Sequence, residues 1–445
     1  MTKLFGTDGI RGKANHYPMT CEIALKTGRA VGFYVKENGY KSVIIGKDTR
    51  ISGDMLEAAL SSGVASTGID VIQAGIIPTP GIAFLCSDVQ EAGAGIVISA
   101  SHNPFQDNGI KIFKHDGTKL SDKEEIKIEA LILDSKFVPQ EEIGKIAIIS
   151  DGLERYAKFL LSRFPFRKPE KKLKIIVDCS NGAASKISRL VFNKDLFEAR
   201  FIYDSPDGTN INDNCGSQHT SQLRQKLIKS RADLGIAFDG DADRLIAVDE
   251  TGQEIGGDRI LAICAKYAKQ KNKLKNNIVV STIMSNVGLA EFLSRNGIRH
   301  VRTDVGDRKV LEGMFKYDAV LGGEDSGHMI FLDSHTTGDG MLSALRLIEV
   351  MLETGQSLSS LASAMAVYPQ VLMNVLVDES RPDFMKNRII ADTIKTVEGK
   401  LGSQGRVLIR YSGTQPLLRV MVEGPDQKIT EHYCNEICNC IKTNI

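Results

Sequence analysis

The feature that most constrains this chain is a repeated unit, in which a short apolar strand leads into a loop rich in Gly, Ser and Asp and then into a helical stretch. Three of the clearest strands are 42–46, 234–238 and 278–282. Alternation of short strands with helices predicts α/β units built around mixed, mostly parallel sheets. Ligands of such sheets bind at the carboxyl ends of the strands, which is where these polar loops fall.

The length of the chain predicts several domains. A chain of 445 residues exceeds what one hydrophobic core organises, since roughly 150 residues per domain is usual. A charged stretch at 121–145 precedes a linker-like segment at 165–172, and Tyr368-Pro369 precedes a new strand. We expect three α/β domains and a smaller C-terminal α+β domain, at 1–155, 156–255, 256–368 and 369–445.

Charge and hydropathy exclude several classes of function. The 56 Lys and Arg residues nearly cancel the 55 Asp and Glu residues, so no global basic field would attract nucleic acid. No stretch approaches the ~18 uninterrupted apolar residues of a membrane span, and the N-terminus lacks the apolar run of a signal peptide. Eight Cys in a chain of this length do not form a disulfide scaffold. We therefore expect a cytoplasmic protein without nucleic-acid or membrane partners.

The loop DGDADR at 239–244 is the sharpest chemical signal. In an extended loop Asp239, Asp241 and Asp243 share one side, so their carboxylates would converge on one hard cation. Three anions packed so closely repel one another without a cation, which favours Mg²⁺. An EF-hand would place Glu250 at its twelfth position, but Arg244 stands where that loop needs Gly, and the flanks are strands. A solvated acidic turn is the remaining alternative.

The loop SASHNP at 99–104 presents a candidate nucleophile. Pro104 biases the residue before it towards extended geometry and ends local strand pairing, so Ser101 and His102 stand at a strand end. A hydrolase triad is one option, but adjacent Ser and His side chains rarely face each other. The chain also lacks a G-x-S-x-G elbow. A polar turn is the alternative.

Two further loops carry groups suited to a sugar phosphate. In GGEDSGH at 322–328, Glu324 and Ser326 offer partners for sugar hydroxyls, and His328 can handle a proton near neutral pH. The alternative for this loop is a Gly-rich turn with a structural His.

The run RYSGT at 410–414 offers a guanidinium, two hydroxyls and Gly-freed backbone amides, an inventory that fits a phosphate. Arg419 follows in the next strand-like run. A hairpin turn is the alternative. Neither a Walker A run nor a G-x-G-x-x-G fingerprint is present, so a nucleotide site is not indicated.

Together these loops resemble the α-D-phosphohexomutase family, and within it the bacterial phosphoglucosamine mutase branch. The resemblance implies four domains, three α/β and a smaller fourth, around one central cleft. It spans nearly the whole chain. The motifs, in the family's order, are FGTDGIRG at 5–12, DTRISG at 48–53, SASHNP at 99–104, NGIK at 108–111, DGDADR at 239–244, VGDR at 305–308, GGEDSGH at 322–328 and RYSGT at 410–414.

The resemblance implies a role for each motif residue. Ser101 would be a phosphoserine that carries the phosphoryl group and shares one Mg²⁺ with the three Asp residues. His328 and Lys111 would handle protons, with acid and base left unassigned between them. Arg11, Lys111 and Arg244 would neutralise charge beside the phosphoserine. The implied substrate contacts are Glu324, Ser326, Arg410, Ser412, Gly413, Thr414 and, more weakly supported, Arg419.

The implied reaction interconverts glucosamine 6-phosphate and glucosamine 1-phosphate through a 1,6-bisphosphate intermediate, for UDP-N-acetylglucosamine and peptidoglycan precursor synthesis. The same chemistry on mannose or glucose phosphate, a phosphatase that uses phosphorylated Ser101, and a non-catalytic binding protein are the alternatives. Gln415 and Asp325 depart from the branch's usual Glu and Gln. Family members are often dimers through the first domain, which leaves a homodimer open, although no interface pattern is visible.

Overall fold

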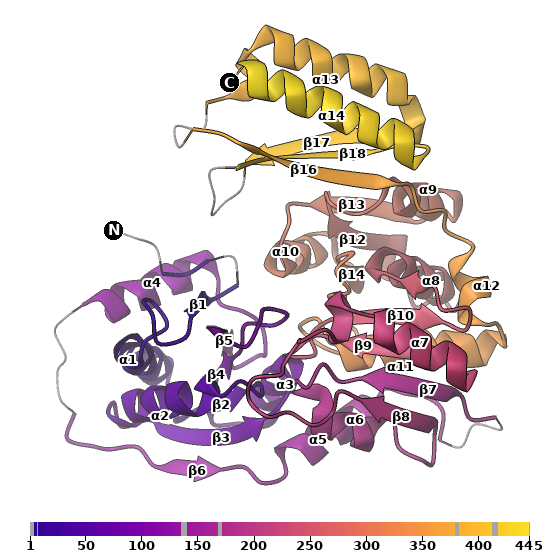
Figure 1. The fold of residues 1–445 in the computed structure, drawn as a ribbon. Helices are drawn as coiled ribbons and strands as arrows, with labels where there is room; N and C mark the ends of the chain where they lie inside the picture. Colours follow the sequence, from indigo (N-terminus) through magenta and orange to yellow (C-terminus); the bar gives the residue numbers. More distant parts are fainter. Residues whose placement is uncertain are drawn as a thin grey trace. The chain divides into compact units, whose positions relative to one another are not determined.

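The computed structural model describes residues 4–6, 8–134, 140–167, 171–378, 382–411 and 417–444. The chain divides into two compact units (Figure 1). The larger unit comprises Met1–Ile283 and Arg299–Ala362, and the smaller comprises Met284–Ile298 and Ser363–Ile445. The larger unit holds three mixed sheets and the smaller unit one antiparallel sheet.

The first sheet of the larger unit has six strands in the order β1-β5-β4-β2-β3-β6. β4, β2, β3 and β6 run parallel to one another, whereas β5 returns antiparallel between β4 and β1. The strands are β1 (Ile10–Lys13), β2 (Ser42–Lys47), β3 (Asp70–Ile76), β4 (Ala92–Ile98), β5 (Asp107–Lys114) and β6 (Ile146–Ile148). The helices are α1 (Cys21–Glu37), α2 (Ser52–Ala65), α3 (Thr79–Asp88) and α4 (Asp122–Leu133).

The second sheet has five strands in the order β11-β10-β9-β7-β8, with β8, β7 and β9 parallel and β10 and β11 antiparallel. The strands are β7 (Lys174–Asp178), β8 (Glu198–Ile202), β9 (Leu234–Phe238), β10 (Leu245–Asp249) and β11 (Glu254–Ile255). The helices are α5 (Gly152–Ser162), α6 (Ala184–Val191), α7 (Ser221–Ser230) and the 3₁₀ turn η1 (Gly216–Gln218).

The third sheet has four strands in the order β13-β12-β14-β15, of which only β15 is antiparallel to its neighbour. The strands are β12 (Ile278–Thr282), β13 (Arg299–Thr303), β14 (Leu321–Gly323) and β15 (Met329–Phe331). The helices are α8 (Gly257–Gln270), α10 (Asp307–Tyr317), α11 (Gly340–Thr354), α12 (Leu358–Ala362) and the 3₁₀ turn η2 (Lys275–Asn277).

The smaller unit has an antiparallel sheet in the order β16-β18-β17. Buried apolar residues such as Val397 and Ile437 pack its helices onto the sheet. Helix α9 belongs to this unit, because Asn286 at its N-cap bonds to Tyr368. The elements are α9 (Val287–Arg295), β16 (Gln370–Leu376), η3 (Phe384–Lys386), α13 (Arg388–Leu401), η4 (Gly402–Gln404), β17 (Arg406–Tyr411), β18 (Leu417–Glu423) and α14 (Gln427–Asn444).

The sequence-based prediction of four domains, three of them mixed α/β and the last α+β, is confirmed. Strands predicted at 234–238 and 278–282 have those bounds and are buried along their whole length. Continuous apolar runs of this kind are typical of strands covered on both faces. Among the described residues, no helix is long and apolar enough to cross a membrane.

Candidate active site

Ser101 lies in the loop between β4 and β5, at the carboxyl end of β4. Its side chain is buried, and its backbone has φ +52°, in the left-handed region that residues with a Cβ rarely adopt. The Ser101 Oγ donates a hydrogen bond to Oδ2 of Asp239 over 2.5 Å, although 138 residues separate the two in sequence. The structure therefore joins the first two motifs that sequence reasoning singled out.

His102 corrects one sequence-based expectation. Its Nδ1 lies 3.3 Å from Ser101 Oγ, so the expectation that these adjacent side chains would not face each other is wrong. The left-handed backbone of Ser101 is the reason, because it differs from the extended geometry in which neighbours point apart. Burial, together with the charges of Arg244 and Arg11, lowers the pKa of His102 to about 4. The imidazole beside the serine is therefore neutral at pH 7.

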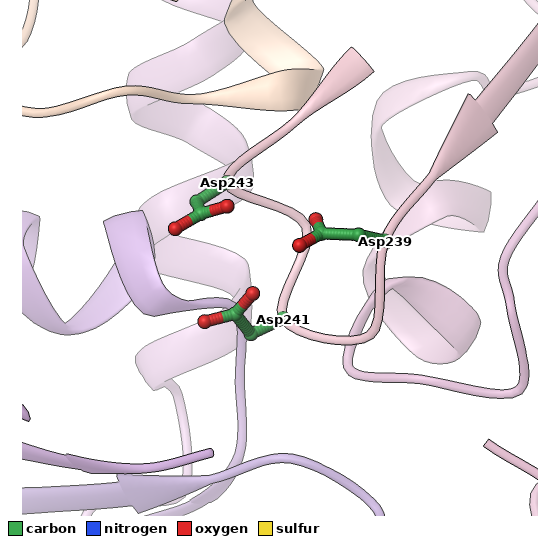
Figure 2. Close-up of side chains that lie close together, drawn as sticks. All are labelled: Asp239, Asp241 and Asp243. Carbon is green, nitrogen blue, oxygen red and sulfur yellow. The ribbon is translucent and has the colours of Figure 1, made fainter. Parts of the chain in front are cut away.

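The three acidic residues of the 239–244 loop form one buried cluster (Figure 2). Asp239, Asp241 and Asp243 each offer a carboxylate oxygen, and these atoms lie within 4.8 Å of one another. The loop connects β9 to β10, so strands flank it and the EF-hand alternative is excluded. Ala242 has φ +56°, which gives the loop its tight turn.

The donor set of this cluster fits a hard divalent cation. Oδ1 of Asp241 and Oδ1 of Asp243 are buried and have no hydrogen-bond partner among the described residues. A buried carboxylate oxygen without a donor is costly, and a cation that prefers oxygen ligands would satisfy it. Burial and the charges of Asp243 and Asp241 raise the pKa of Asp239 well above its usual value. The three side chains are thus the candidate metal ligands.

Lys111, on β5, is a cation that contacts two carboxylates of the cluster. Its buried Nζ lies 2.7 Å from Oδ2 of Asp241, 3.4 Å from Oδ2 of Asp243 and 3.3 Å from Oδ2 of Asp8. Burial alone would lower the pKa of Lys111, but Asp241 and Asp8 raise it well above its ordinary value. Lys111 therefore remains a cation at neutral pH.

His328 reaches the same cluster from the loop before β15. Its Nδ1 lies 3.6 Å from Oδ2 of Asp243, and its Nε2 lies 3.6 Å from Oδ2 of Asp307. Burial opposes protonation, yet Asp243 and Asp307 raise the pKa of His328 above its usual value. A Cβ at Gly338 would lie 2.2 Å from the imidazole Nε2, so the ring fits only against a glycine.

Sequence reasoning assigned no function to three further charged residues beside the cluster. Lys119 pairs with both Asp8 and Asp307, which joins the first and third sheets of the larger unit. Arg11 in turn pairs with Asp8. The two aspartates lie in the motifs FGTDGIRG and VGDR, so the sequence could have pointed to them. Lys119 lies outside every motif, so no feature of the sequence singled it out.

Arg244 and Glu324 complete the predicted residues around the cluster. The Arg244 amide donates to Oδ1 of Asp239 over 3.2 Å, and the buried Nε lies 3.8 Å from Oδ1 of Asp243. Glu324 accepts a hydrogen bond from the Gly306 amide over 3.1 Å. The Oγ of Ser326 is buried, with no hydrogen-bond partner among the described residues. Arg244 Nε and Ser326 Oγ thus remain able to form hydrogen bonds with a ligand.

The predicted phosphate-binding residues lie in the smaller unit. Arg410 on β17 stands opposite Arg419 on β18 in the antiparallel register. Burial and the Arg419 charge lower the pKa of Arg410. Among the described residues neither guanidinium has an ion-pair partner, so the pair is suited to an anion. Ser412, Gly413 and Thr414, and likewise Gln415, lie outside the described residues.

Comparison with known proteins agrees with this geometry. Four domains described as phosphoglucomutase/phosphomannomutase α/β/α domains I, II and III and C-terminal domain match residues 2–139, 154–252, 256–368 and 372–439. The chain belongs to this family. A phosphoglucosamine mutase of Desulforapulum autotrophicum is 60% identical over 459 residues, covering 99% of both chains.

Solved structures of the family show the same fold. A phosphoglucomutase/phosphomannomutase family protein from Burkholderia thailandensis matches with a TM-score of 0.83 at 24% identity, over 99% of this chain and 97% of that one. An N-acetylphosphoglucosamine mutase from Aspergillus fumigatus, solved with GlcNAc-6P and magnesium, matches with a TM-score of 0.67 at 16% identity, over 99% and 96%. The family domains and the relative that is 60% identical make this chain an enzyme of the phosphohexomutase type.

Proposed function

We propose that this enzyme is a phosphoglucosamine mutase, which interconverts glucosamine 6-phosphate and glucosamine 1-phosphate through a phosphorylated Ser101. The observation that carries the proposal is the 2.5 Å contact between Ser101 Oγ and Asp239, which belongs to a cluster of three carboxylates beside Lys111. The amino sugar itself rests on the names of relatives such as the one that is 60% identical.

The site would hold one Mg²⁺ on Asp239, Asp241 and Asp243, with a phosphoserine oxygen as a further ligand. When bound, such an ion stabilises negative charge on a transferring phosphoryl group. The unpartnered oxygens of Asp241 and Asp243 support this assignment. Phosphoryl transfer passes through a loose, in-line transition state, so positioning and charge supply most of the catalysis.

In the first half-reaction the P–Oγ bond of phosphoserine 101 breaks, and a new P–O bond forms to the free sugar hydroxyl. The product is glucosamine 1,6-bisphosphate. Neutral His328 is the proposed acceptor of the hydroxyl proton, because its contact with Asp243 would stabilise the imidazolium that forms. The Ser101 Oγ that leaves the phosphoryl group takes up one proton from solvent. Lys111 stays protonated, so its role is to neutralise the phosphoryl oxygens together with Arg244 and Arg11.

In the second half-reaction the bisphosphate binds in the opposite orientation, and its other phosphoryl group returns to Ser101. Arg410 and Arg419, with Ser412, Gly413 and Thr414, would bind the phosphate that does not react. Glu324 and Ser326 would bind sugar hydroxyls. All eight cysteines are free thiols, which supports the cytoplasmic location that we include in the proposal.

Mass spectrometry of the protein from its own cells tests the central claim. We expect one phosphoryl group on Ser101 and loss of mutase activity in Ser101→Ala. The matched control Ser87→Ala changes an exposed serine whose hydroxyl donates to the Phe84 carbonyl, away from the cluster, and it should retain activity. Full activity in Ser101→Ala, or no phosphate after incubation with glucosamine 1,6-bisphosphate and Mg²⁺, would overturn the mechanism.

Rates on three 6-phosphates test the sugar. The proposal predicts that glucosamine 6-phosphate is turned over faster than mannose 6-phosphate or glucose 6-phosphate under equal conditions. A tenfold preference for mannose would reassign the substrate while leaving the reaction in place. Release of free phosphate at the rate of turnover would indicate a phosphatase instead.

A further inference from the structure

The backbone of the 99–104 loop is held by side chains that the mechanism above does not use. Ser101 has φ +52°, and this conformation is disfavoured for any residue with a Cβ. It persists only where the surroundings over-determine it, and such strain tends to lie at functional sites. The side chains that hold Ser101 in this conformation therefore bear on where its Oγ stands.

Two side chains from distant parts of the sequence bind the same two carbonyl oxygens of this loop. Arg50 Nη2 donates to the Ser101 carbonyl over 3.0 Å and to the Asn103 carbonyl over 2.8 Å. Asn212 Nδ2 donates to those same two oxygens over 2.9 Å each. We call Arg50 and Asn212 the loop clamp.

Arg50 uses its whole guanidinium for this purpose. Its Nε donates to Oδ2 of Asp48 over 2.9 Å, and its Nη1 donates to the carbonyls of Pro104 and Asp107. Together with the two bonds from Nη2, all five N–H donors of the guanidinium have acceptors. The residue is buried, with 3% of its surface exposed. A lysine has three donors at a single point and cannot reproduce this pattern.

The acidic partner of Arg50 continues the network to the amide side of Ser101. Oδ2 of Asp48 accepts a hydrogen bond from Ser99 Oγ over 2.6 Å. Ser99 Oγ in turn accepts from the Ser101 amide over 2.9 Å. Both the N–H and the C=O of Ser101 are thus bound to groups that connect to Arg50.

Asn212 brings the second sheet of the larger unit to the same point. It lies in the loop between β8 and η1 and has φ +60°. Its backbone N–H donates to the Ser180 carbonyl over 2.9 Å. A Cβ at Gly240 would lie 2.5 Å from the Ser101 carbonyl and 2.9 Å from Asn212 Nδ2. The metal-binding loop therefore packs directly against the clamped carbonyl.

We propose that Arg50 and Asn212 are positioning residues, which hold Ser101 in its left-handed conformation so that Oγ faces the three-carboxylate cluster in line for transfer. The inference rests on the proposed function and extends it to residues that do not touch the substrate. A misplacement of about 1 Å at a reacting atom costs ~100-fold in rate. Loss of a clamp contact should therefore lower kcat and leave KM for the sugar phosphate nearly unchanged.

Asn212→Gly and Asn214→Gly form a matched pair. Both asparagines lie in one loop with positive φ, +60° and +52°, so glycine relieves the same backbone strain and adds similar freedom to the unfolded chain. The Asn214 side chain is exposed, and its one hydrogen bond to a described residue goes to its neighbour Asp213. We expect Asn212→Gly to lower kcat by about 10- to 100-fold, with KM within twofold. Asn214→Gly should keep both constants.

Arg50→Lys is the second variant and should lower kcat at least as much, because it retains the charge and loses the planar fork of donors. Its thermal unfolding is measured alongside. If Arg50→Lys does not fold, Asn212→Gly alone decides. Equal kcat changes in Asn212→Gly and Asn214→Gly, or a change in KM alone, would overturn the inference.

The transfer of phosphate from glucosamine 1,6-bisphosphate to Ser101, followed by mass spectrometry, separates this inference from the proposed function. If the unaltered enzyme gains no phosphate, the proposed function fails. If the unaltered enzyme and Asn212→Gly gain phosphate at equal rates, the function stands and the positioning role is refuted. Slower phosphorylation in Asn212→Gly alone supports the clamp.

Discussion

Two cations on strands of this protein, Lys111 in β5 and Arg410 in β17, have opposite surroundings. Lys111 lies among three carboxylates, which raise its pKa well above the ordinary value. Arg410 faces Arg419 across the antiparallel pair, and burial together with this second charge lowers its pKa. Like charges directly opposite each other destabilise a sheet. Lys111 is paired with carboxylates before a ligand arrives, whereas Arg410 and Arg419 have no anionic partner among the described residues.

The difference indicates a division of labour. A cation held by several carboxylates is fixed in place, and fixed placement of charge is what stabilises a transition state. A pair of uncompensated guanidiniums gains most when a phosphate binds, and that gain applies equally to substrate and transition state. We therefore expect changes around Lys111 to affect kcat and changes around Arg410 to affect KM.

Asp243→Asn should have the largest effect. Asp243 offers the cluster one carboxylate and contacts both Lys111 and His328. Its replacement by a neutral amide should reduce kcat on the order of 10³-fold, the scale at which a single preorganised electrostatic contact matters. Steady-state kinetics with saturating Mg²⁺ measures it. Asp116→Asn, outside the cluster, is the control. If Asp243→Asn changed KM alone, the expectation that changes around Lys111 affect kcat would be wrong.

Arg410→Met tests the second region. A hydrogen bond to a charged group contributes about 1.5–3 kcal/mol, so we expect KM for glucosamine 6-phosphate to rise ~10- to 100-fold with kcat changed only a few-fold. The variant should also unfold at the same or a higher temperature without ligand, because the repulsion from Arg419 is gone. Arg388→Met, on the exposed face of α13, is the control. A fall in kcat at constant KM would contradict the proposed division.

Thr79→Val should have a smaller effect, on metal affinity. The Thr79 hydroxyl donates to Oδ2 of Asp241 over 2.6 Å, and its amide donates to the Asp241 carbonyl over 3.0 Å. Groups that orient a metal ligand in this way typically change affinity ~10- to 100-fold. We expect the Mg²⁺ concentration for half-maximal activity to rise about tenfold. Thr251→Val, whose hydroxyl bonds to Asp249 away from the cluster, should leave it unchanged.

The elements that could be predicted were those whose position is determined by neighbouring residues in the sequence. Strands β9 and β12 are continuous apolar runs that end in polar loops, so the sequence shows both their existence and their ends. Strand β5 was harder to predict, because Lys111 breaks its apolar run. That lysine is 2% exposed and is buried by contacts with carboxylates far away in sequence. Periodicity cannot reveal a buried charge whose partners lie on other elements.

The site divides in the same way. The convergence of the three Asp side chains was predicted correctly, but a tight turn with Ala242 at φ +56°, and not an extended loop, brings their carboxylates together. Asn212 could not be predicted, because an asparagine with positive φ reads only as a turn residue. Its contact with the Ser101 carbonyl joins residues 111 positions apart. Arg50 lay in a noted motif, DTRISG, yet the partners of its five donors are visible only in the folded chain.

Asp339 provides the last comparison, between two carboxylates buried in the same unit. Lys111 and His328 hold the pKa of Asp243 well below its usual value despite burial. Among the described residues no Lys, Arg or His forms an ion pair with Asp339, which caps α11 and accepts a hydrogen bond from the Tyr156 hydroxyl over 2.6 Å. Burial raises the pKa of Asp339 from 3.8 to about 6.

The sign of the resulting pH dependence follows from this shift. Because the folded-state pKa exceeds the unfolded value, the contribution of Asp339 to stability is fully present below about pH 3.8 and is lost as the pH rises through about 6. Asp339→Asn keeps a neutral cap at every pH, and asparagine is an equally good N-cap residue. Relative to the unaltered enzyme, the variant should therefore gain stability between pH 4 and pH 7.

Unfolding temperatures measured between pH 4 and pH 7 test this prediction, which concerns stability and involves the smallest change in activity. We expect the difference between Asp339→Asn and the unaltered enzyme to grow by a few degrees, at ~1 °C per kcal/mol for a chain of 445 residues, while kcat at pH 7 changes little. The exposed Asp195→Asn should show a constant difference. If the two variants behave alike, burial without a cation does not govern the titration of Asp339, and the contrast with Asp243 has to be explained by hydrogen bonding instead.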